Sequence, residues 1–246
     1  MSGHSKWHNI ARKKGAVDAQ RAKVFTKFAR EMAVAIRGGG SADPEVNSKL
    51  KDIVAKAKAN NVPNDNINRI LQKYANGAGS EEYEAITYEG YGPKGIAVIV
   101  ETLTDNRNRT AGDMRHYFDK YGGNMGASGC VSWQFDRKGL LVIERLDDMD
   151  EEEMMMQALE AGAADFQADD DVFEIYTAVD DLGSVRESLE KDGYSFLQAE
   201  EAMIPQTYIA LTDDDDIKNM NKLLEMLEDN DDVQNVWHNW ENDHEE

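Results

Sequence analysis

The chain has 246 residues, 41% of them hydrophobic and 8% aromatic, and its formal charge is −21. This hydrophobic share is enough for packed cores and argues against wholesale disorder, while no apolar run approaches the roughly 20 residues of a membrane span. No apolar segment typical of a secretory signal follows the first charges, and the single cysteine, Cys130, excludes a disulfide framework within the chain. We therefore expect a cytoplasmic protein.

Charge is divided unevenly along the chain. Residues 1–77 hold 15 Lys and Arg against 6 Asp and Glu, a net of +9. The remaining residues hold 12 basic and 42 acidic side chains, a net of −30. A basic region followed by a strongly acidic one predicts a polyanionic partner for the basic region, which we call the head (residues 1–78).

The head is predicted to form a small bundle of three helices behind a basic arm. Apolar residues recur at helical spacing from Val17 to Ile36, and three consecutive glycines end this helix. The second helix is expected to begin with Asp43 as its N-cap and Pro44 in its first turn. The third follows Pro63 and closes at Asn76-Gly77.

The acidic body alternates predicted strands and helices. Strands are predicted over residues 83–90, 95–102 and 131–135, with a helix over residues 111–121. From residue 140 the order strand, helix, strand, strand, helix, strand is that of a ferredoxin-like unit. Its predicted elements cover residues 140–144, 150–162, 165–168, 172–178, 182–191 and 196–203.

After Pro205 the pattern continues with a strand over residues 208–211, a helix over 213–227 and a strand over 233–238. We expect this last segment to return to the sheet that begins near residue 83. The predicted fold class is α+β, with an N-terminal three-helix bundle followed by two α/β sandwich-type domains, the last-starting one ferredoxin-like and inserted into the middle one. The expected boundaries are 1–78 for the head, 79–135 with 205–240 for the middle domain, 136–204 for the inserted domain and 241–246 for an acidic tail.

Basic side chains of the head are the first candidates for binding nucleic acid. On a helical projection, the cations between residues 23 and 37 lie opposite the apolar stripe, and their uniform sign favours phosphate contact over a merely solvated face. The candidate residues are Lys6, Arg12, Lys13, Lys14, Arg21, Lys23, Lys27, Arg30 and Arg37.

A second basic group lies in the acidic body. Arg107, Arg109 and Arg115 surround a predicted strand-to-helix turn, where backbone N–H groups also attract anions. Arginines in such acidic surroundings either pair with carboxylates or bind phosphate. The sequence leaves both possibilities open.

Catalytic and cofactor sites are not predicted. The glycine-rich residues 122–129 lack the Gly-Lys-Ser/Thr ending of a phosphate loop and follow a helix, so we interpret them as a turn. The acidic runs at 169–171 and 213–216 lack the spacing of a calcium loop. Cys130 has no paired cysteine and is expected to be inert. We expect no enzyme activity, no metal, no cofactor, no membrane contact and no small-molecule substrate.

Five stretches together identify a family resemblance. They are Gly3-His4-Ser5-Lys6-Trp7, Tyr88-Glu89-Gly90-Tyr91-Gly92-Pro93, Thr104-Asp105-Asn106-Arg107-Asn108-Arg109-Thr110, Gly122-Gly123-Asn124 and Leu227-Glu228-Asp229-Asn230-Asp231-Asp232-Val233-Gln234. They resemble the YebC/PmpR family, whose mitochondrial relatives include the translational activator of cytochrome oxidase. Cys130 and Lys94 depart from the family pattern, where serine and glycine are expected.

The resemblance implies a helical domain followed by two α+β domains, a cytoplasmic location and no known reaction. It also implies one of two roles, because members are described as DNA-binding transcriptional regulators or as translation factors that work on the ribosome. The first head helix offers Lys and Arg but little Asn or Gln on its basic face, which favours sequence-tolerant phosphate contact. An acidic body would also resist lying along a duplex. We therefore favour a factor that binds ribosomal RNA and assists translation, with a DNA-binding transcriptional regulator as the alternative and an enzyme of unknown reaction as a distant third.

Overall fold

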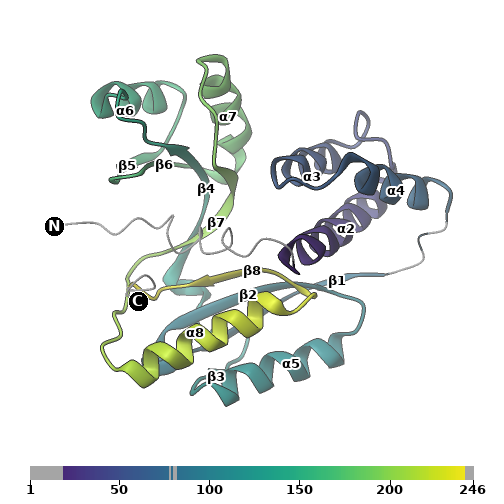
Figure 1. Cartoon of the computed structure of the whole chain (residues 1–246), viewed down its shortest axis with the longest axis vertical. Helices are drawn as coiled ribbons and strands as arrows, with labels where there is room; N and C mark the ends of the chain where they lie inside the picture. The colour runs from purple at the N-terminus through teal and green to yellow at the C-terminus, as the bar shows by residue number, and fades with distance from the viewer. Residues whose placement is uncertain (1–18, 78, 80–81, 242–246) are drawn as a thin grey trace. The chain divides into compact units, whose positions relative to one another are not determined.

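The computed structural model describes residues 19–77, 79 and 82–241 (Figure 1). The described chain divides into two compact units. The first unit contains the residues up to 132 together with 211–238, and the second contains residues 133–210 and 239–241.

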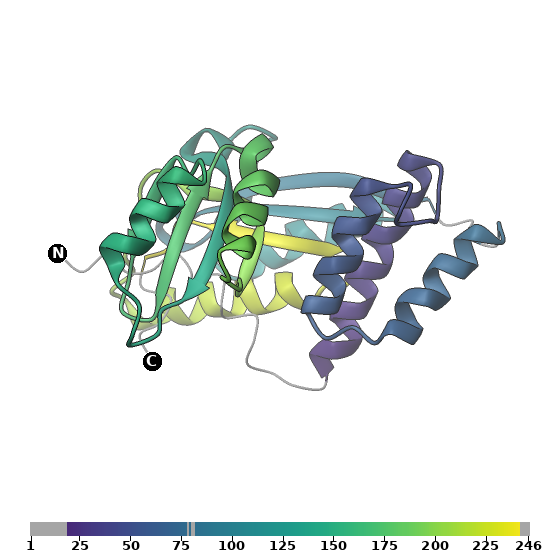
Figure 2. The same ribbon diagram turned by 90° about the horizontal axis from the view of Figure 1, so that it is seen from above.

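The head of the first unit is the predicted helical bundle. It consists of α2 (Ala19–Gly39), α3 (Ser48–Ala59) and α4 (Asn64–Ala75), which Figure 2 shows packed side by side. Met32 and Ile36 of α2 are buried with Leu50 of α3 and Ile67 of α4, as the apolar stripes predict. The bundle therefore has a core of its own.

The predicted start of the second head helix is wrong. Asn47, and not Asp43, is the N-cap of α3, and its side chain accepts a hydrogen bond from the Leu50 N–H at 3.1 Å. The Asn47 amide also donates to the Ala35 carbonyl at 2.9 Å, so this one buried side chain joins α2 to α3. Asp43 instead caps the preceding turn through the Glu45 N–H.

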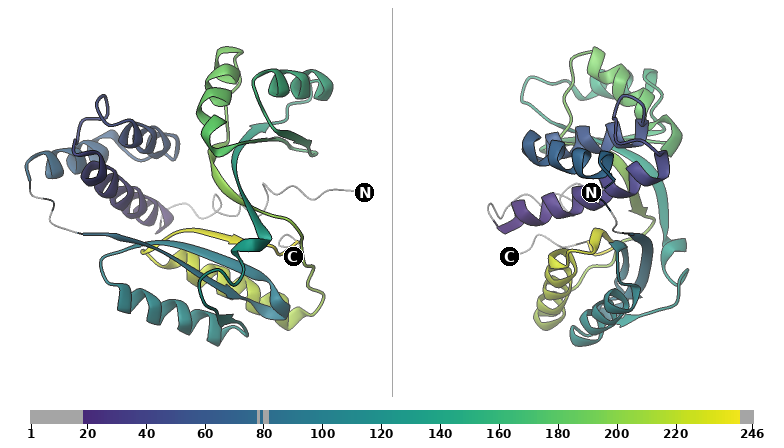
Figure 3. Two further views of the ribbon diagram at one scale, coloured as in Figure 1. Left: turned by 180° about the vertical axis from the view of Figure 1, so that it is seen from behind. Right: turned by 90° about the vertical axis from the view of Figure 1, so that its right-hand side faces the viewer.

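The rest of the first unit is an antiparallel sheet with two helices on one face (Figures 1 and 3). The strands have the order β3-β1-β2-β8. Their bounds are β1 (Glu84–Tyr91), β2 (Ala97–Thr104), β3 (Asn124–Met125) and β8 (Val233–His238), and the helices are α5 (Arg107–Lys120) and α8 (Asp214–Asp229). A short 3-10 helix (Pro93–Gly95) joins β1 to β2, and within it Lys94 has a φ of 53°, in the left-handed region that favours glycine.

The last strand confirms the predicted return of the chain. In the register of β2 and β8, Val100 lies opposite Val236 and Val98 opposite His238. The segment between residues 133 and 210 is therefore inserted between elements of one sheet.

The second unit has the predicted ferredoxin-like order. Its antiparallel sheet runs β5-β6-β4-β7, and α6 and α7 cover one face, where Leu141, Phe173 and Leu189 are fully buried. The bounds are β4 (Phe135–Glu144), α6 (Glu151–Glu160), β5 (Asp165–Ala168), β6 (Val172–Thr177), α7 (Leu182–Lys191) and β7 (Gln198–Pro205), with a 3-10 helix at Val179–Asp181. Asp150 caps α6 by accepting from the Glu153 N–H at 2.9 Å, as expected.

Two predicted strands are absent from the described residues. Residues 131–135 contain a 3-10 helix (Ser132–Gln134), because the buried Glu89 carboxylate accepts the backbone N–H groups of Gly129, Val131 and Ser132 at 2.8–2.9 Å. Those donors are then lost to any sheet ladder. The segment 208–211 forms only one bridge, between Ile209 and Trp240. None of the described helices combines the length and apolarity that crossing a membrane requires.

Candidate nucleic-acid interface

The sequence-predicted basic residues divide into those that the structure describes and those that it does not. Lys6, Arg12, Lys13 and Lys14 lie outside the described residues, and for Arg21 and Lys23 only the backbone, in α2, is described. The other predicted residues, Lys27, Arg30, Arg37, Arg107, Arg109 and Arg115, are placed with their side chains.

Lys27 and Arg30 of α2 contact α8 and the sheet of the same unit, respectively. The Lys27 Nζ lies 3.4 Å from the carbonyl oxygen of Glu228, near the end of α8. The Arg30 Nη1 donates to the Leu103 carbonyl at 2.9 Å, and its guanidinium lies 5.4 Å from the centre of the Tyr83 ring. Only 13% of the Arg30 side chain is exposed, so it is not presented to an external polyanion.

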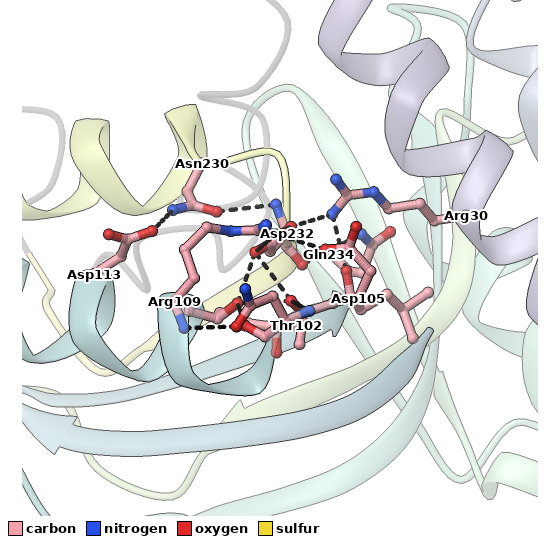
Figure 4. Close-up of polar contacts among 12 residues, drawn as sticks. Arg30, Thr102, Asp105, Arg109, Asp113, Asn230, Asp232 and Gln234 are labelled. Carbon is pink, nitrogen blue, oxygen red and sulfur yellow. Dashed lines mark hydrogen bonds and ion pairs between the residues drawn. The ribbon is translucent and has the colours of Figure 1, made fainter. Parts of the chain in front are cut away.

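The Arg30 guanidinium contacts a buried carboxylate, Asp232, which four side chains surround (Figure 4). We call Arg30, Thr104, Arg109, Thr110 and Asp232 the Asp232 cluster. Asp232 forms an ion pair with Arg30 and accepts hydrogen bonds from the Arg109 Nη2 at 2.9 Å and the Thr110 Oγ1 at 2.6 Å. The Thr104 Oγ1 donates to it at 3.1 Å. Only 3% of the Asp232 side chain is exposed.

The local structure explains why these residues meet. Asp232 lies in the short connection from α8 to β8, where its N–H donates to the side chain of Asn230 at 2.9 Å. Its carbonyl accepts the Leu103 N–H at 2.8 Å, which places it at the end of β2. Thr104 ends that strand, and Thr110 lies in the first turns of α5. One carboxylate thus connects α2, β2, α5 and the start of β8.

The hydrogen bonds decide the ionisation of this carboxylate. Burial alone would raise the pKa of Asp232, but the bonds from Thr110, Arg109 and Arg30 outweigh burial and lower that pKa. The bonds to Asp232 and Asp105 in turn raise the pKa of Arg109. Asp232 is therefore a charged partner that is fully satisfied inside the protein.

The second basic group is divided by the structure. Arg109 pairs with Asp105 at 2.8 Å as well as with Asp232, and Arg107 pairs with Glu84 at 3.2 Å, where both side chains are exposed. Arg115 is exposed and has no ion pair with any residue that the structure describes. The sequence left open whether these arginines pair with carboxylates or bind phosphate. Arg109 is paired with carboxylates in the structure.

Exposed cations on α3 and α4 were not among the residues predicted from the sequence. Lys49 and Lys58 of α3 and Arg69 of α4 are exposed, and none has an ion pair within the described part of the chain. Arg37 is paired with the exposed Glu82 at 3.4 Å, a weak surface contact. These residues contribute to the head's net charge of +9, but the predicted interface included only the arm and the first helix.

The face of α4 also carries neutral polar side chains. Asn68 and Gln72 are exposed, and Gln72 follows Arg69 by three residues and Asn68 by four, so Gln72 is a neighbour of both on the helix surface. Amide and guanidinium groups can read base edges as well as bind phosphate.

Metal sites and reactive thiol sites both place requirements on the side chains of the described residues. No group of three His, Cys, Asp or Glu there is placed to hold a metal ion. Burial, and then the nearby Glu89, raise the pKa of the half-buried Cys130 thiol, which disfavours the reactive thiolate.

Comparisons with known proteins agree with this architecture. The family model described as the TACO1/YebC protein N-terminal domain matches residues 5–77, and that of the TACO1/YebC second and third domain matches residues 83–240. A relative from Ruminiclostridium cellulolyticum is 60% identical, with 100% of this chain and 98% of the relative covered, and one from Acetivibrio thermocellus is 58% identical, with 98% and 99% covered. Both are named probable transcriptional regulatory proteins. A crystal structure of a conserved hypothetical protein from Aquifex aeolicus matches with a TM-score of 0.80 and 43% identity over 92% of each chain.

Proposed function

Because the chain belongs to the TACO1/YebC family, we propose that it regulates gene expression by binding a nucleic acid through its head, mainly through phosphates. The observation that carries the proposal is that the head presents exposed cations although the rest of the chain is acidic. Lys49, Lys58 and Arg69 are exposed without carboxylate partners among the described residues, in a chain whose other regions are strongly acidic.

The proposed interface combines these residues with the sequence-predicted cations of the head. It consists of Lys49, Lys58, Arg69, Arg37, Lys6, Arg12, Lys13, Lys14, Arg21 and Lys23. Lys27 and Arg30 are assigned instead to holding the head against the sheet. Because each phosphate contact releases counterions, binding through this surface is expected to weaken steeply with salt.

Two forms of this function remain as candidates. In the DNA form, which the names of the relatives favour, α4 enters a groove and Asn68, Arg69 and Gln72 contact base edges. In the RNA form, which the acidic body favours, the head binds ribosomal RNA and the protein assists translation. A second contact there would use the exposed Arg107 and Arg115.

Crosslinking in cells followed by sequencing of the attached DNA and RNA tests the proposal. The head variant Lys49→Ser, Lys58→Ser, Arg69→Ser should lose most of the crosslinked nucleic acid. The matched control, Lys120→Ser, Lys191→Ser, Lys218→Ser, removes three exposed lysines elsewhere and should retain it. Recovery of chromosomal sites supports the DNA form, and recovery of ribosomal RNA supports the RNA form. Equal recovery with both variants would contradict the proposed interface.

A further inference from the structure

The second unit carries an exposed apolar surface that the proposed function does not use. Six large apolar side chains are exposed among the described residues, and four of them lie between residues 146 and 159. Three of these, Met155, Met156 and Leu159, belong to α6 and are 39%, 59% and 49% exposed. Clustered exposure of this kind marks interaction sites more often than scattered single side chains do.

The spacing places these three side chains on one face of α6. Leu159 follows Met155 by four residues and Met156 by three, so they are neighbours on the helix surface. The inward positions of the same helix are Met154 and Ala158, which are fully buried in the core of the unit. The core is thus complete without the outward residues, and folding of the unit does not explain their apolar character.

The charged side chains of α6 itself are all acidic. Glu152 lies one turn before Met155 and Met156 on the same face, and Glu160 lies one turn after Met156. Neither has an ion pair with a described residue, whereas Glu151 is paired with Arg145 at 3.1 Å. Residues 136–204 hold 21 acidic and 5 basic side chains, a net of −16.

From this combination we propose that α6 is a docking surface for a Lys/Arg-rich amphipathic helix of a protein partner. Methionines adapt to the shape of an apolar helix face, and the glutamates at their rim complement flanking cations. A net charge of −16 repels nucleic acid and anionic lipid alike, which leaves a basic protein as the complementary occupant. We call Glu152, Met155, Met156, Leu159 and Glu160 the α6 surface.

Fluorescence anisotropy on the full chain tests the proposal with a defined probe. The probe is a labelled Leu/Lys peptide with leucines at i, i+3, i+4 and i+7 spacing, and a peptide of the same composition in scrambled order is the control. The variant Met155→Gln, Met156→Gln, Leu159→Gln should bind the amphipathic probe about tenfold more weakly than the wild type. The wild type should bind the scrambled peptide more weakly by a similar factor.

A matched variant separates this surface from apolar exposure in general. Val46→Gln removes a side chain that is 75% exposed in the head, and it should bind the amphipathic probe as the wild type does. Equal binding of the two peptides, or equal binding by wild type and the α6 variant, would overturn the proposal. So would self-association of the wild type that the α6 variant abolishes without any peptide binding, since the occupant would then be a second copy.

The result is independent of the proposed function. The α6 variant alters no cation of the head and should bind nucleic acid as the wild type does, and its thermal unfolding should be unchanged because the altered side chains are exposed. Loss of nucleic-acid binding by the α6 variant would instead count against the head as the nucleic-acid interface, whatever the result with the peptides.

Discussion

Two groups of basic side chains in the first unit have opposite fates. Arg30 and Arg109 meet Asp232, which follows Arg30 by 202 residues, and both are paired with this buried carboxylate. Lys49, Lys58 and Arg69 lie on the outer faces of two helices and meet no described carboxylate. The difference teaches that the sign of a residue does not decide its role. What decides it is whether folding brings a distant carboxylate to it.

The two groups also differ in how they contribute to free energy. Removing one partner of a buried ion pair is costly, because the charge that remains is held away from water without its counter-charge. An exposed cation contributes little to stability and remains available for a ligand. The comparison therefore predicts large effects on unfolding at the Asp232 cluster and small ones on the outer faces of the head.

The largest expected effect is that of Asp232→Asn. The neutral amide keeps the shape but cannot balance Arg30 and Arg109, so the free energy of unfolding should fall by about 3 kcal/mol. Urea unfolding of the full chain measures the loss. The control Asp119→Asn changes an exposed acid on the outside of α5 and should be almost neutral. A loss of similar size in both variants would mean that the Asp232 cluster contributes no more to stability than an exposed acid does.

Acid should reproduce part of this loss in the wild type. Because the pKa of Asp232 is lowered in the folded state, its stabilising contribution is present above the ordinary aspartate pKa of about 3.9. That contribution is lost as the pH falls from there through the lower folded pKa. Asp232→Asn should therefore show a flatter dependence of unfolding free energy on pH below about pH 4. Parallel profiles for the two proteins would contradict a lowered pKa.

A smaller effect is expected for Arg30→Met. The side chain is almost as long and retains the packing, but it leaves Asp232 with only Arg109 as a charged partner. We expect the free energy of unfolding to fall by roughly 1–2 kcal/mol. The effects of Arg30→Met and Asp232→Asn should be strongly non-additive. A double-mutant cycle with Asp232→Asn measures the coupling, and simple additivity would refute a direct interaction.

The smallest effect is expected for Arg107→Met. Its partner Glu84 and the arginine itself are both exposed, and such pairs contribute about 0–1 kcal/mol. Thermal unfolding should be nearly unchanged. If Arg107→Met lowers stability as much as Arg30→Met does, the exposure of an arginine does not determine how much its ion pair contributes.

Periodicity and caps were enough to predict most of the fold. The α+β class, the helical head, the ferredoxin-like order and the return of the last strand are all confirmed. The errors occur where a side chain acts on distant backbone. Asn47 caps α3 while bonding to α2, and Glu89 takes the donors of residues 129–132 away from a strand. Neither contact has a local sequence signature.

The candidate site was harder to predict for the same reason. Helical projection grouped Arg30 with Lys27 as one outward basic face, and no local rule could reveal that Asp232 would lie beside it. The exposed cations of α3 and α4 could have been predicted from the charge count, because they contribute to the net charge of the head. Arg107, Arg109 and Arg115 could not be separated without knowing which acids the fold brings near each of them.

The salt dependence of nucleic-acid binding tests the central claim most directly. A labelled mixed-sequence RNA and a duplex DNA of equal length are titrated with the full chain between about 50 and 200 mM salt. For the tighter ligand, Lys49→Ser, Lys58→Ser, Arg69→Ser should reduce the slope of log affinity against log salt by about 2–3, while Lys120→Ser, Lys191→Ser, Lys218→Ser leaves it unchanged. A slope that is the same for wild type and head variant would contradict phosphate binding through the outer faces of the head.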